Sequence, residues 1–394
     1  MAALRLKYFL FGDQQPKDGV NKKLLSQVSE LIHLGLDIEL VLANIGDAQH
    51  PSYDFLTLHV VDEHPVKNIF GLIRHARRIS RIFSETMGSL GPDDILYYRY
   101  SGPFPLYYPY NYLRRFRRCK IVTEHQTKEL EEFKLNGNAF SYWSEFFFGG
   151  MLRKQSDAII GVTDEVTQYE IACSGDPVKP HLTIGNGFAV KSVPVRQNSF
   201  HEVEDLQLLC VANISRWHGL DRLLQGIATY SGTPRVRLYV AGNGPELSHL
   251  QKLAGDLNIT DLVAFNGFLT GEALDTLFDQ CHIAVGSLGI HRKGLTQTSE
   301  LKGREYCARG IPYIVACADP DFPPDFPYIL RLPADENPID VERILTFAKE
   351  ICADPDHPQK MRRYAEEHLD WSVKMKKLKG FLEMLVGRVK VTTP

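Results

Sequence analysis

A glycine-rich turn in the second half of the chain is the first feature whose residue types could bind a ligand. Gly242-Asn243-Gly244-Pro245 follows the apolar segment 235–241 and precedes a segment with helical periodicity over 245–257. Glycines at this spacing let the chain turn tightly, and the first amides of the helix could face an anion. A tight turn without a ligand explains the same residues equally well, because the sequence lacks the complete Gly-x-Gly-x-x-Gly fingerprint.

Other local signatures of catalysis give little support to a metal or a cofactor. The sequence has no Walker loop, no Gly-x-Ser-x-Gly elbow and no His-Glu-x-x-His motif. Two Asp-x-Asp motifs, Asp319-Pro320-Asp321 and Asp354-Pro355-Asp356, contain residue types found in metal sites. Because both lie in proline-containing turns, we attribute them to turn chemistry and predict no metal and no other cofactor.

A single histidine, His125, directly follows the apolar segment 120–124. A lone histidine at the end of a strand is often only a packed residue. Open parallel sheets, however, bind ligands outside the carboxyl ends of their strands. We therefore predict that His125 belongs to the active site, with a packed core histidine as the alternative.

Strands alternating with helices must position these residues. In the first half, apolar runs predict strands over 5–11, 37–43, 94–100, 120–124 and 158–162, and amphipathic stretches predict helices over 22–34, 70–87 and 145–155. In the second half the predicted strands are 206–212, 235–241, 263–266 and 283–287, and the predicted helices are 220–229, 245–257 and 272–280. This order predicts an α/β fold with two Rossmann-like, doubly wound domains that face a cleft.

A polar stretch separates the two predicted domains. Residues 191–205 contain Pro194 and show no apolar periodicity, so we interpret them as a linker. The predicted domains then cover 1–190 and 206–370. The last segment, 371–394, contains a basic amphipathic helix over 373–389, which we expect to pack back towards the first domain.

Composition narrows the class of protein. Of the 394 residues, 44% are hydrophobic and 24% are charged, which excludes disordered, collagen-like and disulfide-rich classes. Lys plus Arg (45) against Asp plus Glu (48) argues against a chain built around nucleic acid. The seven cysteines contain no Cys-x-x-Cys pair, and no apolar stretch approaches the length of about 18 residues that a membrane span needs. We therefore place the protein in the cytoplasm.

Two basic clusters in the first half could contact an anionic membrane or a lipid-diphosphate acceptor. One comprises Arg74, Arg77, Arg78 and Arg81 on a predicted helix. The other comprises Arg114, Arg115, Arg117 and Arg118, after the aromatic run SGPFPLYYPYNY. Interleaved aromatic and basic residues favour peripheral attachment at the inner face of a membrane. An ordinary solvated surface is the alternative.

Seven segments, in their order and spacing, give the most specific indication. Four lie in the second half: VANISRWHGLDRLLQGI (211–227), LYVAGNGPELSHL (238–250), VAFNGFLTGEALDTLF (263–278) and SELKGREYCARGIPYIVA (299–316). Three lie in the first half: TEHQTKE (123–129), SDAIIGVTDEV (156–166) and TIGNGF (183–188). Together they resemble the retaining glycosyltransferases of family 4, which have the two-domain GT-B fold.

The resemblance implies a function. Such an enzyme, of the hexosyltransferase type and used in bacterial polysaccharide assembly, moves a sugar from a nucleotide-diphosphate donor to a hydroxyl of a glycan or lipid-linked sugar with retention. In that family the leaving diphosphate takes the acceptor proton. Two alternatives stay open. One is a GT-B-like epimerase or an inverting transferase, with His125 or Glu124 as base. The other is a degenerate nucleotide-sugar-binding protein without turnover.

The resemblance also implies a donor site in the second domain. A breaking bond to a diphosphate needs positive charge and hydrogen-bond donors at its oxygens. The candidates for that role are Arg216, His218, Lys302, Arg304 and the turn around 289–294. Glu305 corresponds to the family's ribose-binding Glu, and we place it at the start of a helix over 304–309 that leads into a strand over 313–316. The predicted donor site is completed by Gly19, Asn213 and Gly242.

Three positions depart from the family pattern. The family pairs Glu305 with a Glu eight positions earlier, where this chain has Gln297. Asn213 and His218 stand where the family has its phosphate-binding Arg and Lys. Gly19 follows an aspartate where many members have two glycines. We predict His125, Gln297 and Glu300 as the catalytic residues, with Glu300 supplying the charge that Gln297 lacks.

Overall fold

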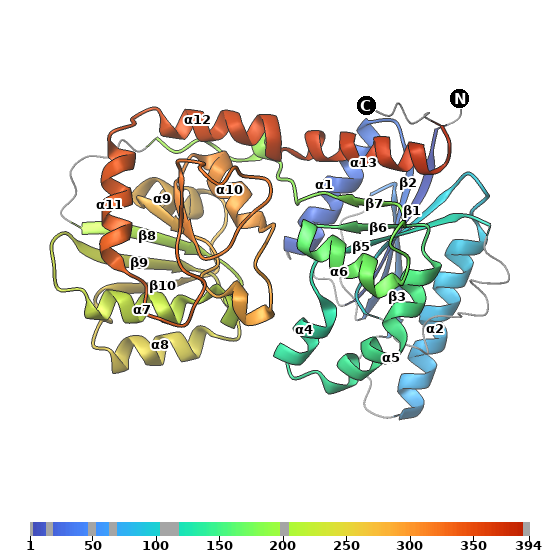
Figure 1. Ribbon diagram of the computed structural model, residues 1–394, viewed down its shortest axis with the longest axis horizontal. Helices are drawn as coiled ribbons and strands as arrows, with labels where there is room; N and C mark the ends of the chain where they lie inside the picture. The colour runs from blue at the N-terminus through green and yellow to red at the C-terminus, as the bar shows by residue number, and fades with distance from the viewer. Residues whose placement is uncertain are drawn as a thin grey trace. The chain divides into compact units, whose positions relative to one another are not determined.

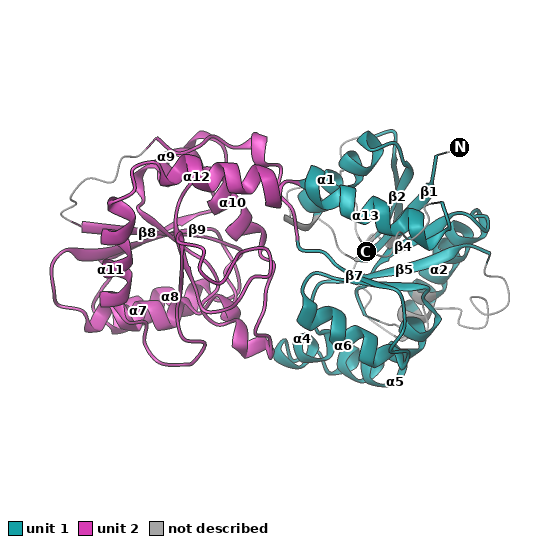
Figure 2. Cartoon of the chain, turned by 45° about the horizontal axis from the view of Figure 1, so that its top comes forward, with its two compact units in different colours: residues 1–185, 371–394 teal, residues 186–370 magenta. Residues whose placement is uncertain are grey.

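The computed structural model describes residues 3–12, 19–45, 53–62, 69–102, 118–197 and 205–388. The chain divides into two compact units, one formed by residues 1–185 and 371–394 and the other by residues 186–370 (Figure 2). Each unit contains its own parallel sheet with helices around it (Figure 1). The predicted class, α/β with two Rossmann-like doubly wound domains, is confirmed.

Unit 1 is built on a seven-stranded sheet of order β3-β2-β1-β4-β5-β6-β7. Its strands are β1 (Arg5–Gly12), β2 (Asp37–Ile45), β3 (Leu56–Asp62), β4 (Ile95–Arg99), β5 (Lys120–His125), β6 (Ala158–Gly161) and β7 (His181–Thr183). All neighbouring strands are parallel, with Leu6 of the central β1 paired to Ile38 on one side and Ile95 on the other. Near-continuous apolar runs form these strands because both faces of a parallel sheet are covered.

Helices connect the strands of unit 1. They are α1 (Gly19–His33), α2 (Ile69–Gly88), α4 (Glu129–Leu135), α5 (Ala139–Gln155), α6 (Asp164–Ser174) and the C-terminal α13 (Trp371–Leu385). One core cluster joins Ile79 and Phe83 of α2 and Leu152 of α5 to Phe9 and Tyr98 of the sheet. Helices α2 and α5 therefore pack on the same face of this sheet. Helix α13 packs against α1, and Lys379 Nζ donates a hydrogen bond to Leu34 O at 2.8 Å.

Unit 2 repeats this plan with a six-stranded sheet of order β10-β9-β8-β11-β12-β13. Its strands are β8 (Asp205–Val211), β9 (Arg235–Ala241), β10 (Val263–Gly267), β11 (Ile283–Val285), β12 (Tyr313–Val315) and β13 (Ile329–Arg331). Its helices are α7 (Leu220–Thr229), α8 (Leu247–Asp256), α9 (Glu272–Gln280), α10 (Leu301–Arg309), α11 (Val341–Cys352) and α12 (His357–Tyr364). Short helical turns lie at η1 (Val190–Ser192), η2 (Arg216–His218), η3 (Ile290–Lys293) and η4 (Ala365–Leu369).

The segment expected to be a linker differs from that expectation. The units divide at Gly185 and Asn186, and η1 already forms within unit 2. Arg196, in the middle of the polar stretch, is only 3% exposed, because its guanidinium NH1 donates to Cys281 O at 2.7 Å. Because Arg196 is charged and the stretch lacks apolar periodicity, the sequence did not show that this side chain is buried in unit 2.

Within the described residues, no helix combines the length and the apolar character that crossing a bilayer requires.

Candidate functional site

The loop after β8 holds three predicted donor-binding residues. Asn213 and Arg216 are exposed, whereas His218 is 8% exposed. The backbone N–H of Ser215 donates to His218 Nδ1 at 2.9 Å, so this ring nitrogen is an acceptor and the proton of the neutral ring is on Nε2. Burial first, and then the charges of Lys302 and Lys293, lower the pKa of His218 well below its usual value. His218 can thus donate a hydrogen bond to an anion only as a neutral imidazole.

Lys302 and Glu300 lie at the start of α10, which follows the loop after β11. Lys302 Nζ is 3.6 Å from Glu300 Oε2, and this carboxylate oxygen accepts the Ser287 backbone N–H at 3.2 Å. Although the Lys302 side chain is only 11% exposed, its ammonium has no hydrogen-bond partner among the described residues. The charge of Lys302 also acts on His218 and on Cys210 near the end of β8, after the larger effect of burial on both. The structure therefore brings Lys302, Glu300 and His218 together at the carboxyl edge of the unit 2 sheet.

The glycine turn after β9 is explained by packing. Gly242 has φ +145°, and a Cβ at this position would lie 1.8 Å from Ala212 O. Its N–H donates to Gly267 O at 2.6 Å, and Ile214 N donates to Asn243 O at 2.6 Å. The Gly242 amide is thus engaged within the protein. Gly242 shapes the site by letting the turn after β9 lie directly against the loop after β8.

Gln297 and Glu305, the two positions of the family's carboxylate pair, both lie near α10. Gln297 forms a parallel bridge with Ala318 after β12 and is partly exposed. Glu305 lies in the second turn of a helix that begins at Leu301, so the expectation that it opens the helix is wrong. Leu301, Lys302 and Gly303 are already helical, so α10 begins four residues before Glu305. Glu305 Oε1 accepts from Arg309 Nε at 2.9 Å, and its side chain is 20% exposed.

Arg304 is unavailable to a phosphate in this structure, contrary to the expectation from sequence. Its side chain is fully buried and forms ion pairs with Asp319 and Asp321. Its Nε also donates to Asn186 O at 2.9 Å. The Asp319-Pro320-Asp321 motif therefore serves as the counter-charge of a buried arginine. A sequence shows that an arginine and two aspartates are present but does not show that they face one another.

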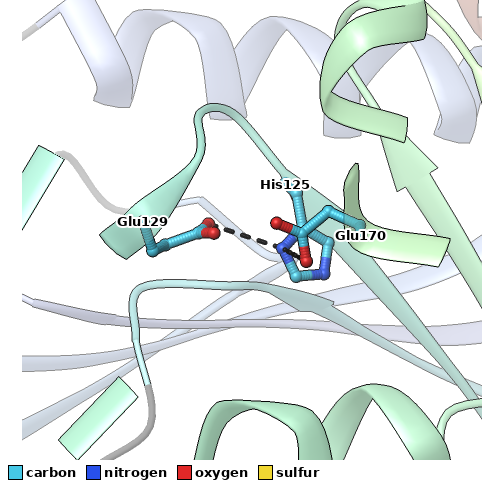
Figure 3. Close-up of side chains that lie close together, drawn as sticks. All are labelled: His125, Glu129 and Glu170. Atoms are coloured by element: carbon cyan, nitrogen blue, oxygen red, sulfur yellow. Dashed lines mark hydrogen bonds and ion pairs between the residues drawn. The ribbon is translucent and has the colours of Figure 1, made fainter. Parts of the chain in front are cut away.

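His125 ends β5 inside a buried ionic network of unit 1 (Figure 3). His125 Nδ1 lies 3.4 Å from Glu129 Oε1 and 3.1 Å from Glu170 Oε2, and Nε2 lies 3.1 Å from Thr123 Oγ1. The ring is 0% exposed, and burial lowers the pKa of His125 to about 4. Both ring nitrogens are therefore engaged, and the neutral ring fills a position beneath the loop that follows β5.

Arg153 of α5 is the cation at the centre of this network. It forms ion pairs with Glu129 at 3.1 Å, with Glu145 at 2.5 Å and with Glu170. Tyr100 adds a hydrogen bond from its hydroxyl to Glu145 Oε2 at 2.8 Å. Burial raises the pKa of Glu129 and Glu170, because charged carboxylates are poorly solvated there.

The same network contains three groups that could ligate a metal. His125, Glu129 and Glu170 present ligand atoms within 4.8 Å of one another. Arg153, however, already contacts both carboxylates and supplies the positive charge that a metal ion would bring. The geometry fits an arginine-centred ionic cluster better than a metal site, and the absence of a metal stays a prediction.

A second buried ion pair lies at the same edge of unit 1 and was missed by sequence reasoning. Lys23 Nζ lies 2.9 Å from Glu124 Oε1, and the Tyr8 hydroxyl donates to Glu124 Oε2 at 2.7 Å. Burial alone would raise the pKa of Glu124, but Lys23, Arg99 and the Tyr8 hydrogen bond lower it to about 2. Helix α1, whose first residue is the predicted Gly19, positions Lys23. The sequence signal that could have pointed to this ion pair is a lysine one turn after the start of the first helix.

Of the predicted membrane or acceptor residues, Arg114, Arg115 and Arg117 lie outside the described residues. Arg118 is described and exposed, just before β5. The other basic cluster is placed in full, since Arg74, Arg77, Arg78 and Arg81 are all exposed on α2.

Comparison with known proteins connects this site to a family. Residues 194–289 match the family described as glycosyl transferases group 1. This segment contains β8 to β11 and the loops that carry Asn213, Arg216, His218 and Gly242. No curated protein matches the sequence.

Several solved structures share the fold over nearly the whole chain. Sucrose-phosphate synthase from Thermosynechococcus elongatus has a TM-score of 0.73 at 14% identity, covering 98% of this chain and 100% of its own. Anabaena HepE in complex with UDP and glucose has a TM-score of 0.64 at 13% identity, covering 96% and 99%. The lipopolysaccharide outer core galactosyltransferase WaaB has a TM-score of 0.65 at 12% identity, covering 96% and 99%. Unit 2 thus contains a segment that matches the glycosyl transferases group 1 family, and the chain as a whole has the two-domain GT-B fold of these structures.

Proposed function

We propose that this chain is a glycosyltransferase of group 1 that moves a sugar from a nucleotide-diphosphate donor to a hydroxyl of a glycan or lipid-linked acceptor, with retention. The observation that carries the proposal is the buried ammonium of Lys302, which has no hydrogen-bond partner among the described residues and lies at the carboxyl edge of the sheet of unit 2, whose residues 194–289 match the family. A diphosphate leaving group gains negative charge as its bond to the sugar breaks, and a desolvated cation stabilises that charge strongly.

The remaining donor contacts follow from the loops around Lys302. Arg216, exposed at the start of η2, and the Nε2–H of His218 supply further donors for phosphate oxygens. Asn213 lies exposed on the same loop, whose backbone rests against Gly242. Glu305 accepts hydrogen bonds from the ribose hydroxyls, with Arg309 fixing its carboxylate from one side.

An inverting transferase or an epimerase would need Glu124 or His125 as a base, and neither side chain is suited to that role. This supports retention without a dedicated protein base. The carboxylate of Glu124 is held by Lys23 and Tyr8, and its pKa of about 2 makes it a weak base. His125 has no exposed surface, and both of its ring nitrogens are engaged. We assign His125 a positioning role, in which its ring fixes the loop at the end of β5, instead of proton transfer.

The nucleotide is proposed to be UDP. HepE, which has the same fold, is described in complex with UDP and glucose, and the pneumococcal O-GlcNAc transferase GtfA in complex with UDP and GlcNAc. Gln297 and Glu300 are proposed to lie beside the donor sugar. The proposed site of action is the cytoplasm, at the inner face of a membrane where a lipid-linked acceptor would be available.

A binding protein without turnover is the second candidate. Gln297 favours it, because an amide supplies no negative charge opposite a positively charged sugar in the transition state. Release of free nucleotide from UDP-, GDP- and ADP-sugars, with analysis of the sugar product, separates the two functions. The transferase releases nucleotide and forms a retained glycoside in the presence of an acceptor, whereas the binding protein is stabilised thermally by a nucleotide sugar and releases none.

A variant of Lys302 tests the observation on which the proposal rests. Lys302→Met keeps the length of the side chain and removes its charge, and we expect kcat/KM for the donor to fall about 100-fold or more. The matched control is Lys252→Met, at an exposed position of α8 in the same unit. Equal activity of Lys302→Met and the control, with equal thermal stability, would remove Lys302 from the donor site.

A further inference from the structure

Helix α5 of unit 1 has an apolar face that the protein leaves exposed. Phe140, Trp143, Phe146 and Phe147 are 55%, 53%, 58% and 63% exposed, and Met151 is 41% exposed. Large aromatic side chains are normally buried. Four exposed ones on a single helix therefore indicate a surface that a membrane or another molecule covers.

The exposed side chains form one continuous patch. Positions 140, 143, 147 and 151 recur every three or four residues and so lie along one stripe of the helix. The rings of Trp143 and Phe147 are stacked with centroids 5.9 Å apart, and Phe146 contacts Trp143 edge-on at 5.8 Å. The opposite side of the helix is anchored in the unit, because Leu152 belongs to the core cluster and Arg153 to the ionic network.

The exposed face of α5 has no acidic side chain. Its exposed positions are Ala139, Phe140, Trp143, Phe146, Phe147, Gly150, Met151 and Lys154. The one carboxylate of the helix, Glu145, points inward and pairs with Arg153. The face thus combines aromatic rings with a single positive charge.

Helix α2 places further positive charge on the same side of unit 1. Ile79 and Phe83 of α2 share a core cluster with Leu152 of α5, so both helices cover one face of the sheet (Figure 1). The outer side of α2 exposes Arg74, Arg77, Arg78 and Arg81. Arg81 forms an ion pair with Glu85 of the same helix at 2.7 Å.

We propose that the outer face of α2 and α5 binds the surface of an anionic lipid bilayer. Trp and Phe insert at the boundary between headgroups and acyl chains, and neighbouring arginines attract anionic headgroups. Exposed aromatic side chains on α5 and exposed arginines on α2, two helices on one face of the sheet, complement that boundary, which is apolar on the acyl-chain side and negative on the headgroup side. The membrane contact therefore combines the basic cluster on α2, which the sequence had indicated, with the aromatic face of α5, which it had not. The inference deepens the proposed function, because a bilayer is where a lipid-linked acceptor would be found.

Sedimentation with vesicles tests the proposal without donor or acceptor, so its outcome is independent of sugar transfer. The full chain is mixed with vesicles of phosphatidylcholine alone or with 30% phosphatidylglycerol, at about 50 and 500 mM salt. We expect at least tenfold stronger binding to the anionic vesicles at low salt, with part of the binding retained at high salt because aromatic insertion is not screened. Absence of binding to anionic vesicles at low salt would overturn the proposal.

Two variants distinguish the contributions of the aromatic and basic groups. Trp143→Ser combined with Phe147→Ser should weaken binding at least tenfold at both salt concentrations, and its control is Phe268→Ser, at a phenylalanine of unit 2 that is 58% exposed. Arg74→Gln, Arg77→Gln and Arg78→Gln together should weaken it only at low salt, by about fivefold for each charge. Their control is Lys252→Gln, Lys349→Gln and Arg363→Gln, all exposed in unit 2.

Other results with the Trp143 and Phe147 variant would contradict the proposal or show that a second copy of the chain binds this face. If the Trp143 and Phe147 variant binds vesicles as the parent does, the face is not the membrane contact. If that variant instead abolishes a dimer seen by sedimentation velocity, the face joins two copies of the chain and the proposal is wrong. Vesicle binding that depends on both groups supports the proposal even if no sugar transfer is found.

Discussion

Arg196 donates a hydrogen bond from NH2 to Nε2 of His357 at 2.9 Å, and this contact fixes the protonation state of the histidine. An arginine is always a donor, so Nε2 must be unprotonated. His357 Nδ1 in turn donates to Asp354 O at 2.8 Å. Burial, followed by the nearby Arg196, lowers the pKa of His357 to about 4, although the contact with Asp354 O opposes the shift.

This pair predicts loss of stability on acidification. Between pH 6.5 and about 4 the unfolded chain binds a proton at His357 that the folded chain does not bind, so the free energy of unfolding falls as the pH falls. A difference of this size between the folded and unfolded pKa corresponds to about 3 kcal/mol. Urea unfolding of His357→Gln, whose amide can still accept from Arg196, should show a shallower loss over this pH range than the parent.

Exposed His249 provides the control for that measurement. The variant His249→Gln should retain the pH dependence of the parent. A His357→Gln variant that loses stability on acidification as steeply as the parent would show that His357 is protonated in the folded state, contrary to the geometry.

Replacing glycine by alanine should have opposite effects on stability at two positions of unit 2. Gly242→Ala places a Cβ 1.8 Å from Ala212 O at a φ of +145°, so the turns after β8 and β9 must separate. We expect a loss of more than about 4 kcal/mol or failure to fold. Gly255→Ala in α8 meets no atom within 4 Å and should stabilise the protein by about 0.5–1 kcal/mol. Thermal and urea unfolding compare the two, and a Gly242→Ala variant as stable as the parent would contradict the packing role.

Arg304 is predicted to act on stability, not on donor affinity. Arg304→Met leaves Asp319 and Asp321 buried without their cation, and breaking such a pair costs about 3–5 kcal/mol. Exposed Arg363→Met should change stability by less than about 0.5 kcal/mol. If Arg304→Met proves too unstable to purify, Arg304→Lys retains the charge for the binding assay. Donor affinity that falls in Arg304→Lys while stability stays constant would return Arg304 to the phosphate site.

His218 should bind the donor in a way that depends little on pH. A protonated His218 ring would bind a phosphate more strongly than a neutral ring. Its Nδ1, however, accepts from Ser215 N–H, and burial keeps the ring neutral well below pH 6.5. We therefore expect titration calorimetry to give the same donor affinity at pH 6 and pH 8. A donor affinity that rises towards pH 6 in the parent, and not in His218→Gln, would show that the imidazolium is the binding form.

The sequence predicted the alternating elements well because apolar periodicity reports which side chains are buried. It predicted helices over 220–229 and 272–280 with the bounds that the structure has, and it indicated the family that residues 194–289 match. It failed where burial and residue type disagree. Arg196 and Arg304 are polar yet buried, while Phe140 and Trp143 are apolar yet exposed, so periodicity placed α5 at 145–155 and missed its first residues, 139–144. Pairing between distant charges, as in Lys23 and Glu124, requires the fold itself.

Glu300 is predicted to supply the charge that Gln297 cannot. Its Oε2 lies 3.6 Å from Lys302 Nζ and accepts from Ser287 N–H, so the carboxylate is held at the edge where the donor sugar would lie. Glu300→Gln retains the hydrogen bond from Ser287 but removes the charge. We expect this variant to lower kcat about 10- to 100-fold with a smaller change in donor affinity, because the lost contact acts mainly in the transition state.

Gln297→Glu is the matched variant for Glu300→Gln, because it restores the carboxylate that the family has at that position. Gln297 is partly exposed beside Ala318, so a carboxylate can be solvated there, and we expect the fold and the activity to tolerate it. The double variant Glu300→Gln, Gln297→Glu should recover part of the lost kcat if one negative charge near the sugar is what the reaction needs. Equal kcat for Glu300→Gln and the parent would show that Glu300 does not compensate for Gln297. No turnover of any donor by the parent would instead favour the nucleotide-sugar-binding protein.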